Sequence, residues 1–553
     1  MKNTTVSRGR NLFHQAVTWL VCVACLLPVA PAQATDGSWT STTGGDYTNA
    51  ANWNGGAIPD ASGIAYFGPT NTFTVNLTAP AWTNNGLTFW PVAGTDTINL
   101  NGNTLVFSST GESYLQGGSG LANTNTLTFI NGSLSMPFNT SARLGGGDHP
   151  VDSFAISTLN FTNVIFNANY WYVGGNGTHV GLGMWNLYNS TATVSTLWIA
   201  SSNGRTDDSG TGILFVANGS LLTVTNVINV GAYGGNGGIS GYITVSNATF
   251  NALNGITLGQ SYTNARGSLT IMAGGVVKVG GVLRSGNGSS TIGKVLMTPG
   301  GLLEFSSIHV FGNAGCVVSN IGGVFQFTNA APTITSDTFG NFSITNGTVS
   351  FRAITNADVT CNQGAKALRS DTVMSWTGTS NTFRLNNATN SGTIDQTYTF
   401  APGTATNFAR LELMNGSTYR NGNVTIGANG SLYLSSGAST ISSVLTAAPL
   451  STIEFDLSNT NSPGCLLSTT NLYLNGCSLQ LDLANPPILN TQFLIISNTL
   501  ASQLSYSFAG GSTRQTFTIN GTNYLTTIAL AGGGTEVLVK TTIPARGTVA
   551  FFR

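Results

Sequence analysis

The stretch from Ile213 to Gly231 reads ILFVANGSLLTVTNVINVG, and the stretch from Tyr242 to Gly259 reads YITVSNATFNALNGITLG. Each contains three short runs of alternating apolar and polar residues, which are separated by small or amide residues. Alternation with a period of two is typical of β-strands, and Asn and Gly tolerate the positive φ angles of tight turns. Both stretches therefore predict three short strands joined by corners.

This pattern recurs in five consecutive copies at a nearly fixed step. The steps are 29, 29, 26 and 26 residues, and the copies begin at Met184, Ile213, Tyr242, Ser268 and Lys294. The turns of the first three copies begin at Asn189, Asn218 and Asn247, respectively. No part of the chain beyond its first residues shows a sustained period near 3.6, so we expect almost no helix.

Two all-β folds fit these observations. Asn-Gly between alternating strands, as at Asn218-Gly219, is a strong hairpin signal and favours antiparallel β-sandwich repeats. A fixed step of about 20–50 residues instead favours a solenoid, in which each coil buries its apolar side chains against its neighbours. We predict an elongated parallel β-helix with Val245 pointing inward, and keep the antiparallel β-sandwich as the alternative.

The N-terminus has the features of a secretory signal peptide. A basic head with Lys2, Arg8 and Arg10 precedes an apolar stretch and the small residues of Ala32-Gln33-Ala34. We expect cleavage between Ala34 and Thr35, and no membrane span in the mature chain. The predicted division is 1–34 signal peptide, 35–165 N-terminal cap and first coils, 166–449 solenoid repeats, 450–540 C-terminal β cap and 541–553 tail.

The composition excludes several classes of function. Three of the 19 basic residues leave with the signal peptide, so 16 basic residues face 19 acidic ones and the net charge is −3. Only 7% of the chain is charged, which argues against a basic patch and against nucleic-acid binding. A hydrophobic content of 41% also argues against a disordered chain.

Both ends of the mature chain carry a distinctive pattern of residues. At the N-terminal end the pattern comprises Trp39, Tyr47, Asn49, Ala50, Ala51, Asn52, Trp53, Gly55, Gly56, Pro59, Tyr66 and Phe67. The segment NGLTF (85–89) follows it, and the segment NYLTTIALAGGGTEVLVK (523–540) lies near the other end. These residues resemble proteins with autotransporter-associated β-strand repeats, which are exported β-solenoid proteins of the verrucomicrobial and planctomycetal type; the two segments are similar to the first strand and closing hairpin of that family. The resemblance implies a right-handed β-solenoid, an extracellular or outer-surface location and no established enzyme activity. A departure is that the residues after Lys540 are too few for a translocator barrel.

Candidate catalytic residues are few. A β-helix polysaccharide lyase or hydrolase would need clustered carboxylates, together with calcium or a positioned Arg or Lys. The candidate acids are Asp207-Asp208 beside Arg205, and Asp148 and Asp152 around His149-Pro150. Both groups are typical of polar surface loops.

Other chemistry-bearing residues also lack a site pattern. The remaining mature histidines are His179 and His309, and neither has metal-ligand spacing. The mature cysteines are Cys316, Cys361, Cys465 and Cys477, of which the last two could close a local loop or remain buried thiols. We therefore expect no catalytic residue, no metal and no cofactor.

Aromatic residues give a third class of function, carbohydrate binding. The candidate rings are Trp39, Trp53, Trp82, Trp90 and the run Tyr170-Trp171-Tyr172. They could stack on sugars, although capping of the first coils is the interpretation that we favour. The sequence thus predicts a secreted, non-catalytic structural or adhesive surface protein, with extracellular polysaccharide or cell-surface components as partners. A carbohydrate-binding protein and a polysaccharide lyase or hydrolase are the alternatives.

Overall fold

The fold is taken from a computed structural model. It describes residues 35–543 except for the short segments 68–71, 90–93, 109–111, 118–123, 138–140, 145–155, 175–180, 202–209, 233–237, 261–263, 288–289, 311–314, 329–332, 337–341, 346–347, 353–359, 362–374, 378–380, 387–388, 391–397, 401–407, 420–422, 436, 459–466, 484–488, 491, 499–504, 509–513, 520–521 and 533–535. The predicted signal peptide, Ala34 of its cleavage site and most of the 541–553 tail lie outside these residues. Within them, helical structure is limited to the short 3₁₀ turns η1 (Ala50–Asn52) and η2 (Asn54–Gly56).

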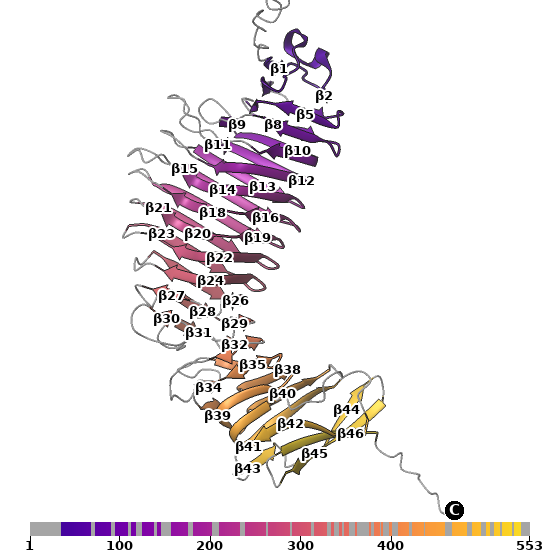
Figure 1. Ribbon diagram of the computed structural model, residues 1–553, viewed down its shortest axis with the longest axis vertical. Coiled ribbons are helices and arrows are strands. Elements are labelled where there is room, and N and C mark those ends of the chain that lie inside the picture. The colour runs from indigo at the N-terminus through magenta and orange to yellow at the C-terminus, as the bar shows by residue number, and fades with distance from the viewer. Residues whose placement is uncertain are drawn as a thin grey trace, which may run out of the picture.

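The chain forms a parallel β-solenoid, which rises as a single elongated stack (Figure 1). Each turn contributes one strand to each of three faces, and the strands of successive turns pair in parallel. Long strands such as β12 (Ile156–Val173) bend round the corners and serve all three faces. The fold predicted from the repeat is confirmed.

The three faces are named by the order in which a turn visits them. Face 1 contains β2 (Gly45–Asp46), β4 (Thr74–Asn76), β7 (Gly94–Asn99), the first part of β10 (Thr124–Met136), the first part of β12, β13 (Gly181–Tyr188), β15 (Gly210–Ala217), β18 (Ile239–Ser246), β21 (Ala265–Ile271), β23 (Ile292–Met297), β25 (Val317–Ile321), β28 (Phe342–Thr345), β31 (Ser375–Thr377), β34 (Tyr398–Phe400), β37 (Val424–Ile426), the end of β39 (Ser439–Ala447), the middle of β41 (Leu467–Leu483) and β43 (Ser505–Phe508).

Face 2 follows the first corner of each turn. It contains β5 (Ala81–Asn84), β8 (Thr104–Phe107), the end of β10, the middle of β12, the start of β14 (Thr191–Ser201), β16 (Leu221–Val224), β19 (Thr249–Ala252), the start of β22 (Val276–Ser285), the start of β24 (Leu302–Val310), β26 (Val324–Phe327), β29 (Thr348–Arg352), β32 (Asn381–Asn386), β35 (Phe408–Met414), β38 (Ser431–Ser435), β40 (Thr452–Leu457) and the end of β41.

Face 3 closes each turn. It contains β1 (Gly37–Trp39), β3 (Ile64–Phe67), β6 (Gly86–Phe89), β9 (Glu112–Gly117), β11 (Ser141–Leu144), the ends of β12, β14, β22 and β24, β17 (Ile228–Ala232), β20 (Gly255–Gln260), β27 (Thr333–Ser336), β30 (Thr360–Cys361), β33 (Thr389–Asn390), β36 (Thr418–Tyr419), the starts of β39 and β41, and β42 (Gln492–Asn498).

The register on face 1 matches the copies identified in the sequence. Met184 pairs with Ile213, Ile213 with Tyr242, Tyr242 with Ser268, and Ser268 with Lys294. The alternative in which the chain reverses at Asn218-Gly219 is therefore wrong for this region.

The core is a set of inward rows along the solenoid axis. One row on face 1 runs through aligned positions that are at most 2% exposed, namely Ile98, Phe129, Phe161, Leu187, Val216, Val245, Ile271 and Met297. Alternation along each strand places these side chains inside and their polar neighbours outside. Val245 points inward, as predicted.

Asparagines with positive φ form the corner between faces 1 and 2. Asn163, Asn189, Asn218 and Asn247 have φ between 46° and 56°. The Asn189 amide donates to Oδ1 of Asn163 at 2.6 Å, so some of these side chains also link successive corners. At the same corner of a later turn stands Leu450, which is 71% exposed and has φ 66°. This left-handed conformation is unfavourable for a residue with a side chain such as leucine.

Aromatic residues fill the N-terminal end of the stack. Trp39 and Trp53 are 3% and 2% exposed, and their rings meet edge-on at 5.1 Å. Tyr47 and Phe67 pack against the same group, and Trp53 Nε1 donates to the carbonyl of Tyr47 at 2.7 Å. The rings that carry the sequence resemblance thus cap the first coil.

The other end changes from parallel to antiparallel pairing. Parallel pairing continues beyond Leu450 through β40 and β41. β42 then pairs antiparallel with β46 (Glu536–Thr542), which pairs with β45 (Thr522–Ala531), and β45 pairs with β44 (Arg514–Ile519). This antiparallel layer covers strand edges that the last coil would otherwise leave open to other chains.

Replacing Val245 by Asp should destabilise the solenoid strongly, because it would bury a charge that has no partner. We expect the free energy of unfolding to fall by about 3 kcal/mol or more, measured by urea titration followed by circular dichroism. The matched control is Thr244→Asp on the outer side of the same strand, for which we expect a change within about 0.5 kcal/mol. Equal losses in the two variants would contradict the inward position of Val245.

Candidate functional site

The acids singled out in the sequence lie outside the described residues. This applies to Asp207-Asp208 with Arg205 and to Asp148-His149-Pro150 with Asp152, and also to His179 and Cys465. His309 lies on the outer side of face 3, in the end of β24. Cys316 and Cys477 are buried thiols, and burial raises the pKa of Cys477 to about 11.

Most of the candidate aromatic residues face inward. Trp39, Trp53 and Trp171 are buried, and Trp82 is partly buried with its Nε1 donating to the carbonyl of Pro59. Trp90 lies outside the described residues. Tyr170 and Tyr172 flank Trp171 and are half-buried on the outer side of face 3.

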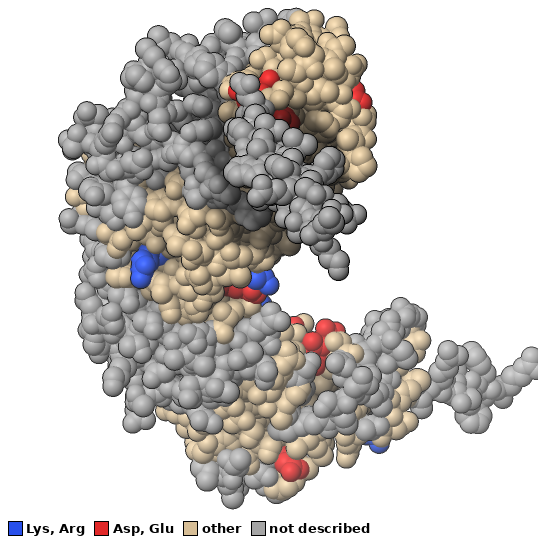
Figure 2. All heavy atoms as spheres, turned by 45° about the horizontal axis from the view of Figure 1, so that its top comes forward, with Lys and Arg blue, Asp and Glu red and all other residues tan. Residues whose placement is uncertain are grey.

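A concentration of charge that sequence reasoning missed lies on face 2. One outward row of this face passes through the aligned positions Thr193, Thr223, Asn251, Lys278, Glu304, Gln326, Ser350, Arg384, Glu412, Tyr433, Glu454 and Gln480. In a chain with so few charges, this row gathers polar groups whose successive members are 21 to 34 residues apart in sequence. On the side drawn in Figure 2, charged side chains are sparse, and a blue and a red patch adjoin beside the central hollow.

The first charged group of the row joins three successive turns. Lys278 Nζ lies 3.2 Å from Glu304 Oε2, and Gln326 Nε2 donates to Glu304 Oε1 at 2.8 Å. The Lys278 side chain is 53% exposed, whereas that of Glu304 is only 11% exposed. Both oxygens of the nearly buried carboxylate therefore have a partner from a neighbouring turn.

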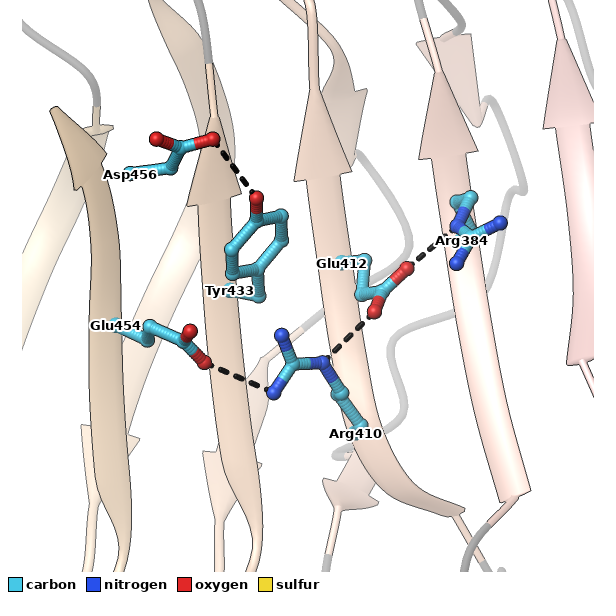
Figure 3. Close-up of polar contacts among 6 residues, drawn as sticks. All are labelled: Arg384, Arg410, Glu412, Tyr433, Glu454 and Asp456. Atoms are coloured by element: carbon cyan, nitrogen blue, oxygen red, sulfur yellow. Dashed lines mark hydrogen bonds and ion pairs between the residues drawn. The ribbon is translucent and has the colours of Figure 1, made fainter. Parts of the chain in front are cut away.

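The second group is a chain of ion pairs across β32, β35, β38 and β40 (Figure 3). Glu412, which is 7% exposed, binds Arg384 Nε through Oε2 at 2.5 Å and Arg410 Nε through Oε1 at 2.7 Å. Arg410 also lies over the ring of Tyr433, 4.6 Å from its centroid, and its Nη1 reaches Glu454 at 2.9 Å. We call Arg384, Arg410, Glu412, Tyr433, Glu454 and Asp456 the face 2 cluster.

Tyr433 and Asp456 close this cluster. Tyr433 donates its hydroxyl proton to Asp456 Oδ2 at 3.0 Å. Burial, the hydrogen bond to Asp456 and the nearby carboxylates raise the pKa of Tyr433 to about 12. Burial disfavours the charged form of Asp456, but hydrogen bonds from Ser458 and Tyr433 outweigh it and lower the pKa of that carboxyl. At neutral pH the phenol is protonated and the carboxylate is ionised.

The arrangement joins adjacent turns. Glu412 is held between two arginines, and Glu454 is held by Arg410. Among the residues that the structure describes, no three His, Cys, Asp or Glu side chains are grouped to hold a metal ion.

Asp96 is a different kind of carboxyl, because it lies inside the core. It is 1% exposed and occupies the position that Leu127 takes in the next turn. Oδ1 accepts a hydrogen bond from the backbone N–H of Phe73 at 3.2 Å, while Oδ2 has no hydrogen-bond partner within the described part of the chain. Burial raises the pKa of Asp96 to about 7, against the opposing effect of the Phe73 bond.

The folded protein should therefore lose stability as the pH rises. The folded state holds the Asp96 proton more tightly than the unfolded chain, whose carboxyl has a pKa near 3.8. The free energy of unfolding should then fall between about pH 4 and pH 7, by at most about 4 kcal/mol. Asp96→Asn should reduce this fall, as measured by urea titrations at pH 4.5 and 8. A variant with the same pH dependence as the wild type would refute the assignment.

Glu412→Gln should weaken the C-terminal turns. The amide keeps the shape of the side chain but leaves Arg384 and Arg410 without their shared countercharge, so we expect a loss of about 2 kcal/mol. The matched control is Lys278→Gln, which removes the exposed partner of a similar pair and should cost less than about 1 kcal/mol. Urea unfolding measures both losses, and a Glu412→Gln midpoint equal to that of the wild type would show that the cluster contributes nothing.

Comparison of the chain with family models, with curated proteins and with solved structures finds no match. A search of the described residues also finds no helix that is both long and apolar enough to cross a membrane.

Proposed function

We propose that the chain is an exported, non-catalytic structural or adhesive component of the cell surface or the extracellular matrix. The observation that carries this proposal is the parallel stacking, which on face 2 continues from β5 to β41 and repeats each outward position about every 4.8 Å over many turns. Such a stack holds long rows of side chains at fixed spacing, as an extended binding surface requires.

The chemistry of the charged row supports a scaffold. Arg384 and Arg410 share Glu412, and Arg410 also binds Glu454, so these charges bind one another across turns. The N-terminal signal pattern predicts export, and export would place these faces outside the cell. The family resemblance at both ends implies the same location.

An assay for product release separates this proposal from a polysaccharide lyase or hydrolase. The purified mature chain is incubated with acidic and neutral polysaccharides, with and without calcium, and reducing ends and unsaturated products are measured. We expect no release, and no difference between the wild type and the double variant Asp207→Ala/Asp208→Ala. Release by the wild type that the double variant abolishes would overturn the proposal.

A further inference from the structure

One outward row of face 3 differs in chemistry from the charged row of face 2. It occupies six successive turns, at the ends of β12 and β14, in β17 and β20, and at the ends of β22 and β24. The aligned residues are Tyr172, Trp198, Asn229, Thr257, Arg284 and His309. The row therefore contains two aromatic rings, an amide, a hydroxyl, a guanidinium and an imidazole, and no carboxylate.

The two rings form the N-terminal end of this row. Tyr172 and Trp198 are register partners, their ring planes lie within 15° of each other and their centroids are 6.0 Å apart. Both side chains are half-buried, so the surrounding structure restricts their rotamers while part of each ring remains accessible. Tyr170 lies two residues before Tyr172 on the same side of the strand.

The other end of the row is basic. Arg284 is exposed, and no carboxylate in the described residues forms an ion pair with it. This sets Arg284 apart from Arg384 and Arg410, which form ion pairs with Glu412 and, for Arg410, also with Glu454. An exposed guanidinium without its own carboxylate is available to bind one from a ligand.

We propose that this row is a binding track for a linear acidic polysaccharide. The rings of Tyr172 and Trp198 stack on the apolar faces of sugar units, because Tyr and Trp combine a large apolar surface with a polar tip. Thr257, which is half-buried, supplies a hydroxyl in the middle, and Arg284 pairs with a sugar carboxylate.

Geometry favours a chain-like ligand over a compact one. Adjacent positions of the row are one strand spacing apart, so the track from Tyr172 to His309 is about 24 Å long. An extended polysaccharide repeats its units on a similar scale and can meet successive turns in the same way. The inference rests on the proposed adhesive role and specifies the ligand class for it.

Binding of polygalacturonate to the mature chain, measured by biolayer interferometry, tests the proposal. We expect Trp198→Ala to weaken binding about tenfold, and Arg284→Gln to weaken it severalfold and reduce its dependence on salt. The matched controls are Tyr242→Ala and Lys294→Gln, which remove an exposed ring and an exposed charge from face 1 and should bind like the wild type.

Three outcomes would overturn the track: no binding of polygalacturonate, equal losses in the controls, or equally tight binding of a neutral, soluble mixed-linkage β-glucan. Circular dichroism of each variant ensures that a loss of binding is not caused by unfolding. If Trp198→Ala fails to fold, the binding of Arg284→Gln still tests the proposal. Absence of binding would refute the binding track but not the proposed non-catalytic function. Release of sugar products would refute the proposed function itself.

Discussion

The stacking of one turn on the next is the constraint on which the rest of this structure depends. A single turn has three short strands with open edges and an apolar interior. On its own it can neither pair the backbone groups of those edges nor bury its apolar side chains. Parallel pairing in register satisfies both at once, because it closes the backbone hydrogen bonds and aligns inward side chains such as Val216 and Val245. The aromatic group around Trp53 and the antiparallel strands after β42 complete the two ends of the stack.

The same register decides what the outside of the molecule presents. Since every turn repeats the same three faces, an outward position becomes a row, and the described rows differ in chemistry. Face 2 carries ion pairs such as that of Arg384 with Glu412, whereas face 3 carries the paired rings of Tyr172 and Trp198. A sequence with few charges therefore still produces surfaces of distinct character.

The repeat could be predicted from the sequence because its period is nearly constant between Met184 and Lys294, so the pairing of these copies follows directly.

The face 2 cluster could not be predicted from the sequence. Its aligned positions Arg384, Glu412, Tyr433 and Glu454 are separated by 28, 21 and 21 residues, because the corners of these turns vary in length. Acids that are adjacent in the sequence, such as Asp207-Asp208, lie in segments typical of loops. The acids of the cluster, such as Glu412 and Glu454, come from different turns and are far apart in the sequence. Trp198 was missed for the same reason, since only the register places it beside Tyr172.

The direction of the hydrogen bonds has a mechanical consequence. In this stack the bonds between turns run along the long axis, and β1 and the β44–β46 layer lie at opposite ends (Figure 1). Tension between those ends therefore loads the bonds of the terminal turn first, and turns should detach one at a time. Each turn of 26 residues, as between Tyr242 and Ser268, would release about 90 Å of extended chain. A protein anchored at one end and attached to a surface at the other would then lengthen in steps under flow, dissipating energy at each turn while the remaining turns stay folded.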